Sequence, residues 1–138
     1  MSTTKTSGAS RLEEQPPASK LLNRRLVGVN DTGGVVIAFD AQPDFTNRHG
    51  TVQGGFLAAM LDSATAFTLL MVLPADQTAV TMRLDTTFLK PAHPGALVAH
   101  AKILERNDRH AIVVADLQTS EGVVVARAQA ELRILPRR

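Results

Sequence analysis

The sequence contains no cysteine, no tryptophan and no tyrosine among its 138 residues. The absence of cysteine excludes disulfide bonds, zinc sites built on thiolates and cysteine nucleophiles, and it fits a reducing compartment. The absence of tryptophan and tyrosine removes the side chains that most often stack on bases. These absences argue against thiolate chemistry and against nucleic acid as a primary partner.

Histidine is also scarce, with four residues in the chain. His49, His93, His100 and His110 show none of the spacings at which helical histidines bind a metal, such as HExxH. We therefore expect no metal site and no need for a metal or redox cofactor.

Long apolar runs are missing as well. Residues 1–18 are polar and contain no apolar signal core. The most apolar stretch, residues 54–75, is interrupted by Asp62 and small polar residues, which makes it too polar for a membrane span. The formal net charge is only +2, and no compact basic helix is present. The sequence predicts a soluble, cytoplasmic protein with neither membrane nor nucleic acid partners.

The chain has the length of one domain, and hydrophobic residues make up 44% of it, enough for a core. Residues 1–18 are rich in Ser, Thr and Pro and are predicted to be a disordered arm. Residues 19–138 are predicted to form a single domain. Its start permits a short helix over residues 19–25, capped by Ser19.

Two strand-like segments follow, residues 26–31 and 35–41. The turn residues from Asn30 to Gly34 join them into a predicted hairpin. Residues 54–73 are rich in Ala, Leu and Met, which favours a helix that ends before Pro74. Because this helix is apolar nearly all round, it must be buried on most sides.

Four strand-like segments without another helix complete the chain, and we interpret them as a meander. The last of them alternates. One face is predicted to carry Val125, Arg127, Gln129, Glu131 and Arg133, and the other Ala126, Ala128, Ala130, Leu132 and Ile134. One helix cannot cover both faces of a sheet of about six strands. The sheet should therefore curl around the helix, with its outer face in solvent and its edges or the helix side free for dimerisation.

The residues around the helix start resemble a known family motif. Asn47 precedes Gln53-Gly54-Gly55, and Asp62 follows seven residues after the second glycine. Thr86–Pro91 (TTFLKP) resembles the same family's strand that ends in an aromatic residue and a proline. Over roughly residues 25–135 the chain thus resembles PaaI-like hotdog-fold acyl-CoA thioesterases, with Gln53 where His is usual. The resemblance implies an α+β hotdog fold, an antiparallel curled sheet around one long central helix.

The residue types at this motif suit thioester hydrolysis. A carboxylate on a mostly buried helix is costly unless it is paired or used, so Asp62 is the candidate base or nucleophile; alternatively it bonds a backbone donor across the core. Gly54 at the helix N-terminus offers a free N–H for an oxyanion, or simply a tight turn. Because the two lie about 12 Å apart along one helix, we infer an active site shared across a two-fold dimer.

Two more residues are candidates for catalysis. Asn47 could orient water or assist Asp62, and Thr81 matches a Ser/Thr position of the family, although a turn residue and a strand residue explain them as well. The resemblance also implies contacts with acyl-CoA, whose phosphates suit Arg and Lys. The residues at the corresponding positions are Gln53, Gly55, Arg83, Phe88, Arg106, Arg109 and His110.

The predicted function is hydrolysis of an acyl-CoA thioester to the free acid and CoA. The resemblance implies a homodimer or a dimer-of-dimers tetramer. Two alternatives stay open, a non-catalytic acyl-CoA-binding hotdog protein and a hotdog hydroxyacyl-thioester dehydratase that uses His49. The helix residues Phe56, Met60 and Phe67 either form an apolar acyl pocket or belong to the core.

Overall fold

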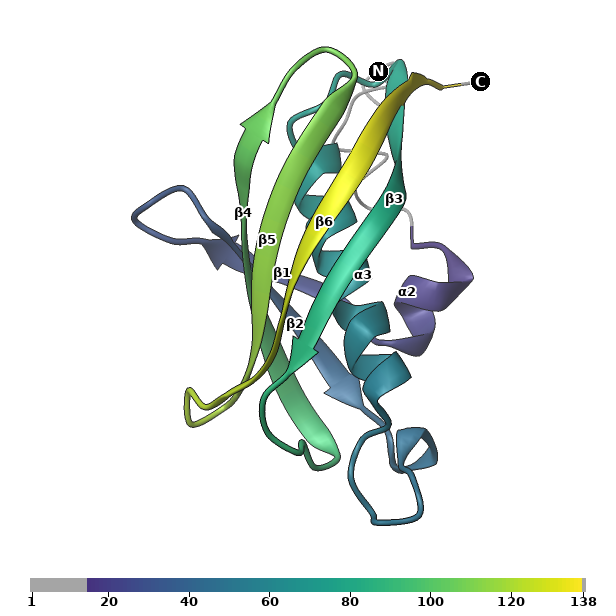
Figure 1. The fold of residues 1–138 in the computed structure, drawn as a ribbon, viewed down its shortest axis with the longest axis vertical. Helices are drawn as coiled ribbons and strands as arrows, with labels where there is room; N and C mark the ends of the chain where they lie inside the picture. The colour runs from purple at the N-terminus through teal and green to yellow at the C-terminus, as the bar shows by residue number, and fades with distance from the viewer. Residues whose placement is uncertain (1–14, 138) are drawn as a thin grey trace, which may run out of the picture.

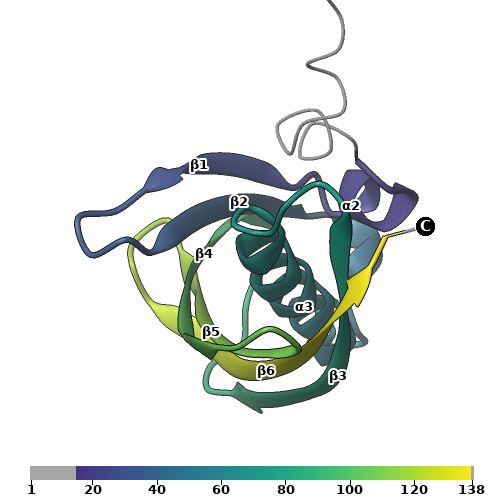
Figure 2. The same cartoon turned by 90° about the horizontal axis from the view of Figure 1, so that it is seen from above.

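The computed structural model describes residues 15–137. A sheet of six strands curls around the long helix α3, as Figure 1 and Figure 2 show. The elements follow in the order α2 (Pro17–Leu21), β1 (Arg25–Val29), β2 (Val35–Ala41), the 3-10 turn η2 (Pro43–Phe45), α3 (Gly54–Leu70), β3 (Gln77–Phe88), β4 (Gly95–Arg106), β5 (His110–Thr119) and β6 (Val124–Pro136). The predicted α+β architecture, a curled antiparallel sheet around one central helix, is confirmed.

The helix α2 differs from the one predicted over residues 19–25. It begins at Pro17, follows the extended Pro16 and has no side-chain cap. Proline suits the first helical position because its fixed φ is helical and its missing N–H has no intrahelical partner there. Ser19 is buried inside the helix, so the prediction that it caps the helix was wrong. The predicted disordered arm lies outside the described residues over residues 1–14.

The strands lie in the order β1-β2-β4-β5-β6-β3, and all neighbouring pairs are antiparallel. The predicted β1–β2 hairpin is confirmed, and its turn contains Gly33 at φ 84, a left-handed conformation that favours glycine. The predicted four-strand meander is wrong, since β3 pairs with β6 rather than with β4. In this position β3 extends the sheet around the far side of α3, and β1 and β3 form its two free edges (Figure 2).

The core lies between α3 and the concave face of the sheet. Met60, Leu61 and Leu69 of α3 are fully buried, together with large side chains such as Phe39 and Leu132 from the strands. Burial of this apolar surface, at about 25 cal/mol per Å², holds the sheet on the helix. The predicted burial of the helix on most sides is confirmed. Within residues 15–137 no helix is both long and apolar enough to cross a bilayer.

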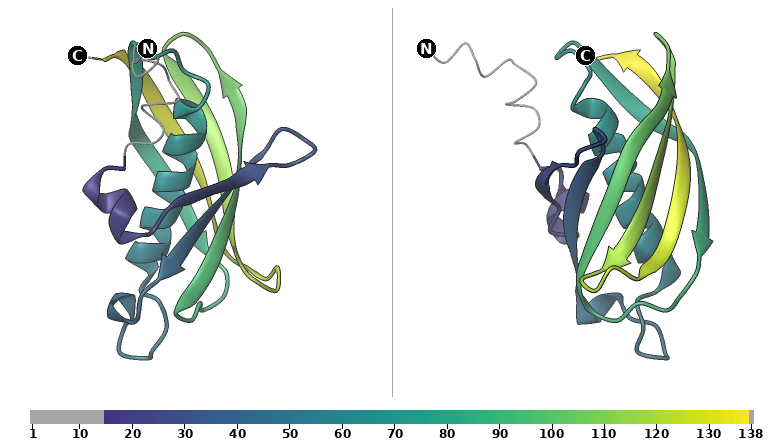
Figure 3. Two further views of the ribbon diagram at one scale, coloured as in Figure 1. Left: turned by 180° about the vertical axis from the view of Figure 1, so that it is seen from behind. Right: turned by 90° about the vertical axis from the view of Figure 1, so that its left-hand side faces the viewer.

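One side of α3 is not fully covered by the sheet, and we call it the open side. Its residues recur every three or four positions and are nearly all small: Gly55, Ala58, Ala59, Asp62, Ser63 and Ala66. It lies at the gap between β3 and the β1–β2 edge, beside α2 (Figure 2 and Figure 3). Small side chains here would allow another helix to approach closely.

Arg24, which follows α2, packs against α3 at this gap. Its guanidinium lies 4.2 Å from the centre of the Phe67 ring and donates a hydrogen bond of 3.2 Å to Ser63 Oγ. Desolvation by burial lowers the pKa of Arg24. The contact fixes the segment after α2 to the helix, and Phe67 itself is buried in the core.

The sheet also has an outer face, defined as the side chains of β3 to β6 that point away from α3. In β6 the predicted alternation is confirmed, because the side chains from Ala126 to Ile134 are alternately buried and exposed. Val125 is the exception: it is buried next to a register shift between β5 and β6, where the ladder is irregular. The outward side of β6 is therefore polar, as the sequence indicated.

Candidate active site

The loop before α3 is held by its own hydrogen bonds. The Oδ1 atom of Asn47 accepts bonds of 2.9 Å from the His49 N–H, 3.3 Å from the Thr51 N–H and 3.2 Å from Thr51 Oγ1. Gly50 completes the turn at φ 80. The side-chain oxygen of Asn47 thus has the structural role of a turn residue, and only its Nδ2 group remains to orient water.

Further contacts fix the first turn of α3 in place. The Gln53 N–H donates to the Phe45 carbonyl over 2.9 Å, and the Val52 N–H donates to the Ala92 carbonyl over 2.8 Å. The ring of Phe56 stacks on that of Phe45 with centroids 4.2 Å apart. The helix N-terminus is therefore a rigid feature, anchored both to the loop before it and to the segment after β3.

The first amide groups of α3 are free. The hydrogen bonds to the Gln53 carbonyl begin with the N–H groups of Phe56 and Leu57. In the part of the chain that the structure describes, the N–H groups of Gly54 and Gly55 have no acceptor. Free N–H groups at a helix N-terminus, with its partial positive charge, form a binding site for an anion or an oxyanion.

Gly54 also lies against an aromatic ring. A Cβ atom at this position would lie 3.2 Å from Cε1 and Cζ of Phe88, which is closer than ordinary packing. Glycine is therefore required for the present position of the ring. Gly54 and Phe88 border a groove of about 360 Å³, with Val52, Leu57, Leu89, Lys90 and Pro91 as its other lining residues. The groove is apolar except for Lys90.

The carboxylate of Asp62 is held by a strand residue. Asp62 is half-buried on the open side of α3, and its Oδ1 atom accepts a hydrogen bond of 2.8 Å from Thr81 Oγ1. Within residues 15–137, its Oδ2 atom has no donor. The structure therefore shows a side-chain hydroxyl as its partner, rather than the backbone donor considered as an alternative. One oxygen is fixed and the other is free to contact a water molecule or a substrate.

A bulge in β3 places the hydroxyl of Thr81. The register between β3 and β6 shifts between Thr81 and Arg83, and the extra residue, Met82, is exposed. Bulges of this kind redirect side chains and occur often beside active sites. Thr81 is therefore best described as a positioning residue for Asp62.

Replacing Thr81 with Val is expected to lower by about 10-fold the kcat of a reaction that uses the Asp62 carboxylate, the scale of one lost hydrogen bond to a charged group. KM should change little, because the Thr81 hydroxyl contacts the Asp62 carboxylate and would act on the substrate only through it. The control is Thr81→Ser, which keeps the hydroxyl and should retain kcat within about 3-fold. A Ser variant as slow as the Val variant would show that the methyl group, and not the hydroxyl, is what matters.

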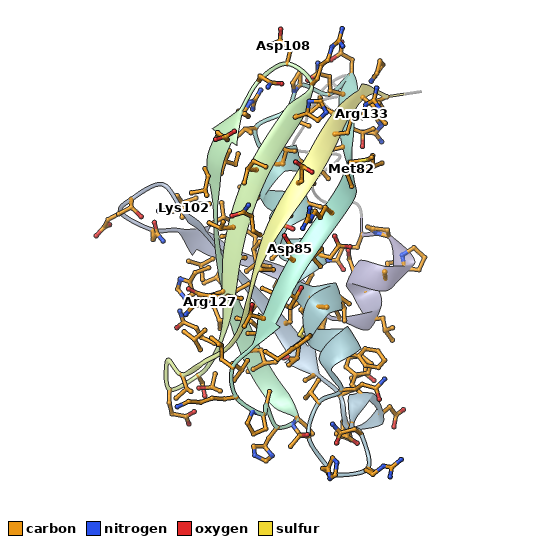
Figure 4. All side chains as sticks on the ribbon, in the orientation of Figure 1. Met82, Asp85, Lys102, Asp108, Arg127 and Arg133 are labelled. Atoms are coloured by element: carbon orange, nitrogen blue, oxygen red, sulfur yellow. The ribbon has the colours of Figure 1, made fainter. Side chains whose placement is uncertain are left out.

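The predicted cationic contacts lie elsewhere in the chain. Arg106, Arg109 and His110 are exposed around the β4–β5 turn. This turn, marked by Asp108 in Figure 4, lies at the opposite end of the molecule from the start of α3. Arg83 points outward from β3 and forms a 3.1 Å ion pair with Asp85. In a single chain these residues do not line the groove at Gly54.

The remaining predicted residues lie close to the helix start. Gln53 and Gly55 are exposed there, and His49 is exposed on the preceding loop. Phe56 and Phe67 have core partners, and Met60 is fully buried. In a single chain, Met60 and Phe67 belong to the core cluster and Phe56 packs against it. Sequence reasoning missed the groove residues Leu57 and Lys90, because a helical leucine and a surface lysine carry no distinctive signal.

Gly54 and Asp62 do not converge within one chain. They are the first and ninth residues of α3, which separates them by about 12 Å along the helix axis. A thioester carbonyl group cannot contact both at once.

Comparison with known proteins identifies the family. Residues 49–126 match the Thioesterase superfamily. The chain belongs to this superfamily. A phenylacetic acid degradation-related protein of Ralstonia eutropha JMP134 is 32% identical to this chain, with a TM-score of 0.84 over 91% of this chain and 98% of the other.

Two further solved structures share the fold. The PaaI protein of the E. coli phenylacetic acid degradation operon is 19% identical, with a TM-score of 0.82 over 94% of this chain and 92% of the other. The BH2602 protein of Bacillus halodurans, solved with CoA, is 24% identical, with a TM-score of 0.77 over 92% and 81%. The predicted hotdog fold and the PaaI-like resemblance of this chain are confirmed.

Proposed function

We propose that this thioesterase hydrolyses an acyl-CoA thioester to the free acid and CoA. Asp62 is the general base or nucleophile, and the Gly54 N–H is the oxyanion donor. The observation that carries the proposal is the 2.8 Å bond from Thr81 Oγ1 to Asp62 Oδ1, which leaves the other carboxylate oxygen free. A catalytic base must be held in place by its surroundings while one of its oxygens stays accessible.

In the general-base route, Asp62 takes a proton from water while the water oxygen bonds to the thioester carbonyl carbon. The carbonyl oxygen becomes negative and accepts a hydrogen bond from the Gly54 N–H. When this intermediate collapses, the C–S bond breaks and CoA leaves as a thiolate, which takes up the proton. The products are the carboxylic acid and CoA.

In the nucleophilic route, an oxygen of Asp62 bonds directly to the carbonyl carbon and CoA leaves as a thiolate. The resulting mixed anhydride is then hydrolysed by water, which restores the carboxylate of Asp62. Both routes use the same two groups, the carboxylate of Asp62 and the Gly54 N–H, and they differ in whether a water molecule lies between the carboxylate and the carbonyl carbon.

The proposed site is shared between two subunits. The separation of Gly54 and Asp62 in one chain supports this, and so does the open side of α3 with its small residues. The free edge of β3 carries the exposed apolar residues Val80 and Met82, which suit contact with a second subunit. A two-fold axis that packs the helices antiparallel brings Gly54 of one subunit to Asp62 of the other.

The same dimer explains the position of the predicted cationic residues. Antiparallel packing brings the β4–β5 turn of one subunit toward the helix start of the other. Arg106, Arg109 and His110 of that turn would then face a ligand bound at Gly54, where they suit the phosphates of CoA. The CoA bound by the BH2602 protein is consistent with this choice of substrate.

The proposal is tested by hydrolysis of phenylacetyl-, hydroxybenzoyl-, hexanoyl-, decanoyl- and palmitoyl-CoA, measured as released thiol. Turnover of at least one of them is expected, and the preferred acyl group assigns the substrate class. Tight binding of the esters without any thiol release would support the non-catalytic alternative instead.

Mixing two inactive variants tests the shared site directly. Asp62→Asn and Gly54→Pro each disable one half of the site and should be nearly inactive alone. Refolded together in equal amounts, they form mixed dimers with one intact site, and random pairing predicts about a quarter of wild-type activity. If both halves came from one chain, the mixture would show no more activity than the separate variants.

A further inference from the structure

Arg24 is a charged residue that is almost completely buried. Its exposed fraction is 8%, although the next residue, Arg25, is exposed and forms a 3.1 Å ion pair with Asp40. The guanidinium of Arg24 contacts Ser63 and Phe67, which lie one turn apart on α3. Two adjacent arginines therefore have opposite surroundings, and the buried one requires an explanation.

The buried guanidinium has no anionic partner within residues 15–137. A guanidinium carries five N–H donors, and in that part of the chain Arg24 uses one nitrogen, Nη1, to donate the 3.2 Å bond to Ser63 Oγ. The side chain therefore has donors left for an anion. Buried charges in proteins are usually paired with an opposite charge or with several hydrogen-bond acceptors.

Packing alone does not account for a guanidinium at this position. The ring of Phe67 lies 4.2 Å away and attracts the cation, but a cation–π contact offsets only part of the cost of taking a charge out of water. A methionine could pack against the same ring without any charge to desolvate. The charge itself therefore points to a ligand of opposite sign.

Arg24 lies close to the candidate catalytic carboxylate along α3. It follows α2, which lies beside the open side of the helix (Figure 2). Its partner Ser63 comes directly after Asp62 and, like Asp62, is half-buried. Along the helix axis, Ser63 and Phe67 lie about 1.5 and 7.5 Å beyond Asp62. A ligand whose carbonyl group contacts Asp62 therefore needs only a short chain to reach the guanidinium.

We propose that Arg24 binds a carboxylate at the far end of the acyl group, so that the site prefers CoA esters of short dicarboxylic acids. This inference rests on the proposed function and names the substrate class of the same site. An arginine fork can bind both oxygens of a carboxylate. Asp62, the one charged residue of α3, repels a second carboxylate nearby. Arg24 therefore decides between charged and neutral acyl groups.

The test compares pairs of esters that have the same chain length and differ only in the terminal carboxylate. The pairs are succinyl- and butyryl-CoA, glutaryl- and pentanoyl-CoA, and adipyl- and hexanoyl-CoA. In at least one pair, the wild type should hydrolyse the dicarboxylic ester with a kcat/KM about 10-fold or more above that of its neutral counterpart. This is the scale of hydrogen bonds between charged groups. The best pair also gives the chain length that fits.

Replacing Arg24 with Met should remove this preference. The ratio of kcat/KM between the two esters of the best pair should fall to about one or below, because the carboxylate loses its partner and still meets Asp62. The ratio is the readout, since a general disturbance of the site lowers the rates for both esters alike. Thermal melting checks that the variant is folded.

The adjacent arginine supplies the matched control. Arg25→Met makes the same chemical change at an exposed position whose partner is Asp40, and it should leave the ratio within about 3-fold of the wild type. Arg24→Lys keeps a positive charge but lacks the planar fork, so it should retain only part of the preference. A ratio that falls equally in the Arg24→Met and Arg25→Met variants would reflect overall charge and overturn the assignment to Arg24.

Changes at Ser63 test the same position with Arg24 intact, and they decide the question if Arg24→Met does not fold. Ser63→Asp places a carboxylate beside the guanidinium, where Ser63 Oγ now lies 3.2 Å from Nη1. This internal anion should take the place of the ligand's carboxylate and abolish the preference. Ser63→Asn has nearly the same shape without the charge and should keep the ratio within about 3-fold of the wild type.

The outcomes separate this inference from the proposed function. Equal hydrolysis of both esters in every pair would support the thioesterase activity and overturn the carboxylate site, as would a preference that persists in Arg24→Met or in Ser63→Asp. Thiol release from none of the esters would contradict the proposed function. The Kd values of the same pairs, measured by titration calorimetry, then test the carboxylate site alone. The dicarboxylic ester should bind about 10-fold more tightly to the wild type but not to Arg24→Met.

Discussion

Replacing Asp62 with Asn is expected to lower kcat for acyl-CoA hydrolysis by about 1000-fold, within the range for loss of a general base. Asn keeps an oxygen that accepts the bond from Thr81 Oγ1, so the packing between α3 and β3 should be preserved. It can neither take a proton from water nor attack the carbonyl carbon efficiently. The measurement is single-substrate kinetics on the preferred acyl-CoA, with KM and kcat determined separately.

The matched control is Asp44→Asn, which removes a carboxylate from the exposed turn η2. It should leave kcat unchanged. Equal activity of the wild type and the Asp62→Asn variant would show that the catalytic carboxylate is assigned wrongly. Thermal melting of both variants distinguishes loss of chemistry from loss of folding.

Replacing Gly54 with Pro is expected to lower kcat by about 100-fold or more, the scale of one removed oxyanion donor. Gly54 is the first residue of α3, where proline is best tolerated because the N–H is not used by the helix. The preceding Gln53 is already extended at φ −62 and ψ 137, the conformation that proline requires before it. The variant therefore removes an N–H group with little change to the helix.

The Gly54→Ala variant separates the two effects of this change. Alanine adds the same Cβ atom, which must displace the Phe88 ring, but it keeps the N–H. Phe88 is largely exposed at the end of β3 and can move. Alanine should thus retain most of kcat and change KM, whereas proline should lose kcat. If both variants lose kcat equally, the crowding of Phe88 explains the effect and the oxyanion role is wrong.

The first hairpin, the long helix and the last strand could be predicted from the sequence because each of them has a local signal. The Asn30–Gly34 turn defined the first hairpin, the Ala- and Leu-rich run defined α3, and the alternation in β6 identified its buried face. Strand order has no local signal, because alternation shows which face of a strand is buried but not which strand lies beside it. The position of β3 beside β6 could therefore not be derived from the pattern alone.

The candidate site, too, could be predicted only in part from the sequence. The spacing of Gly54 and Asp62 was visible in the sequence, and the structure adds the bond from Thr81 that holds the carboxylate. The loop role of Asn47 Oδ1 depends on the exact fold of residues 47–51, which no spacing specifies.

The position of β3 at the edge beyond β6 also determines when the site can form during folding. Thr81 lies near Asp62 in sequence, but its strand is held in the sheet by β6, where its ladder partner is Leu132. Pairing between segments so distant along the chain is slow, since a long loop must close first. Until β6 is in place, β3 and β5 both present unpaired edges, which are prone to aggregate. The hydrogen bond between Thr81 and Asp62 therefore depends on a strand from the far end of the chain.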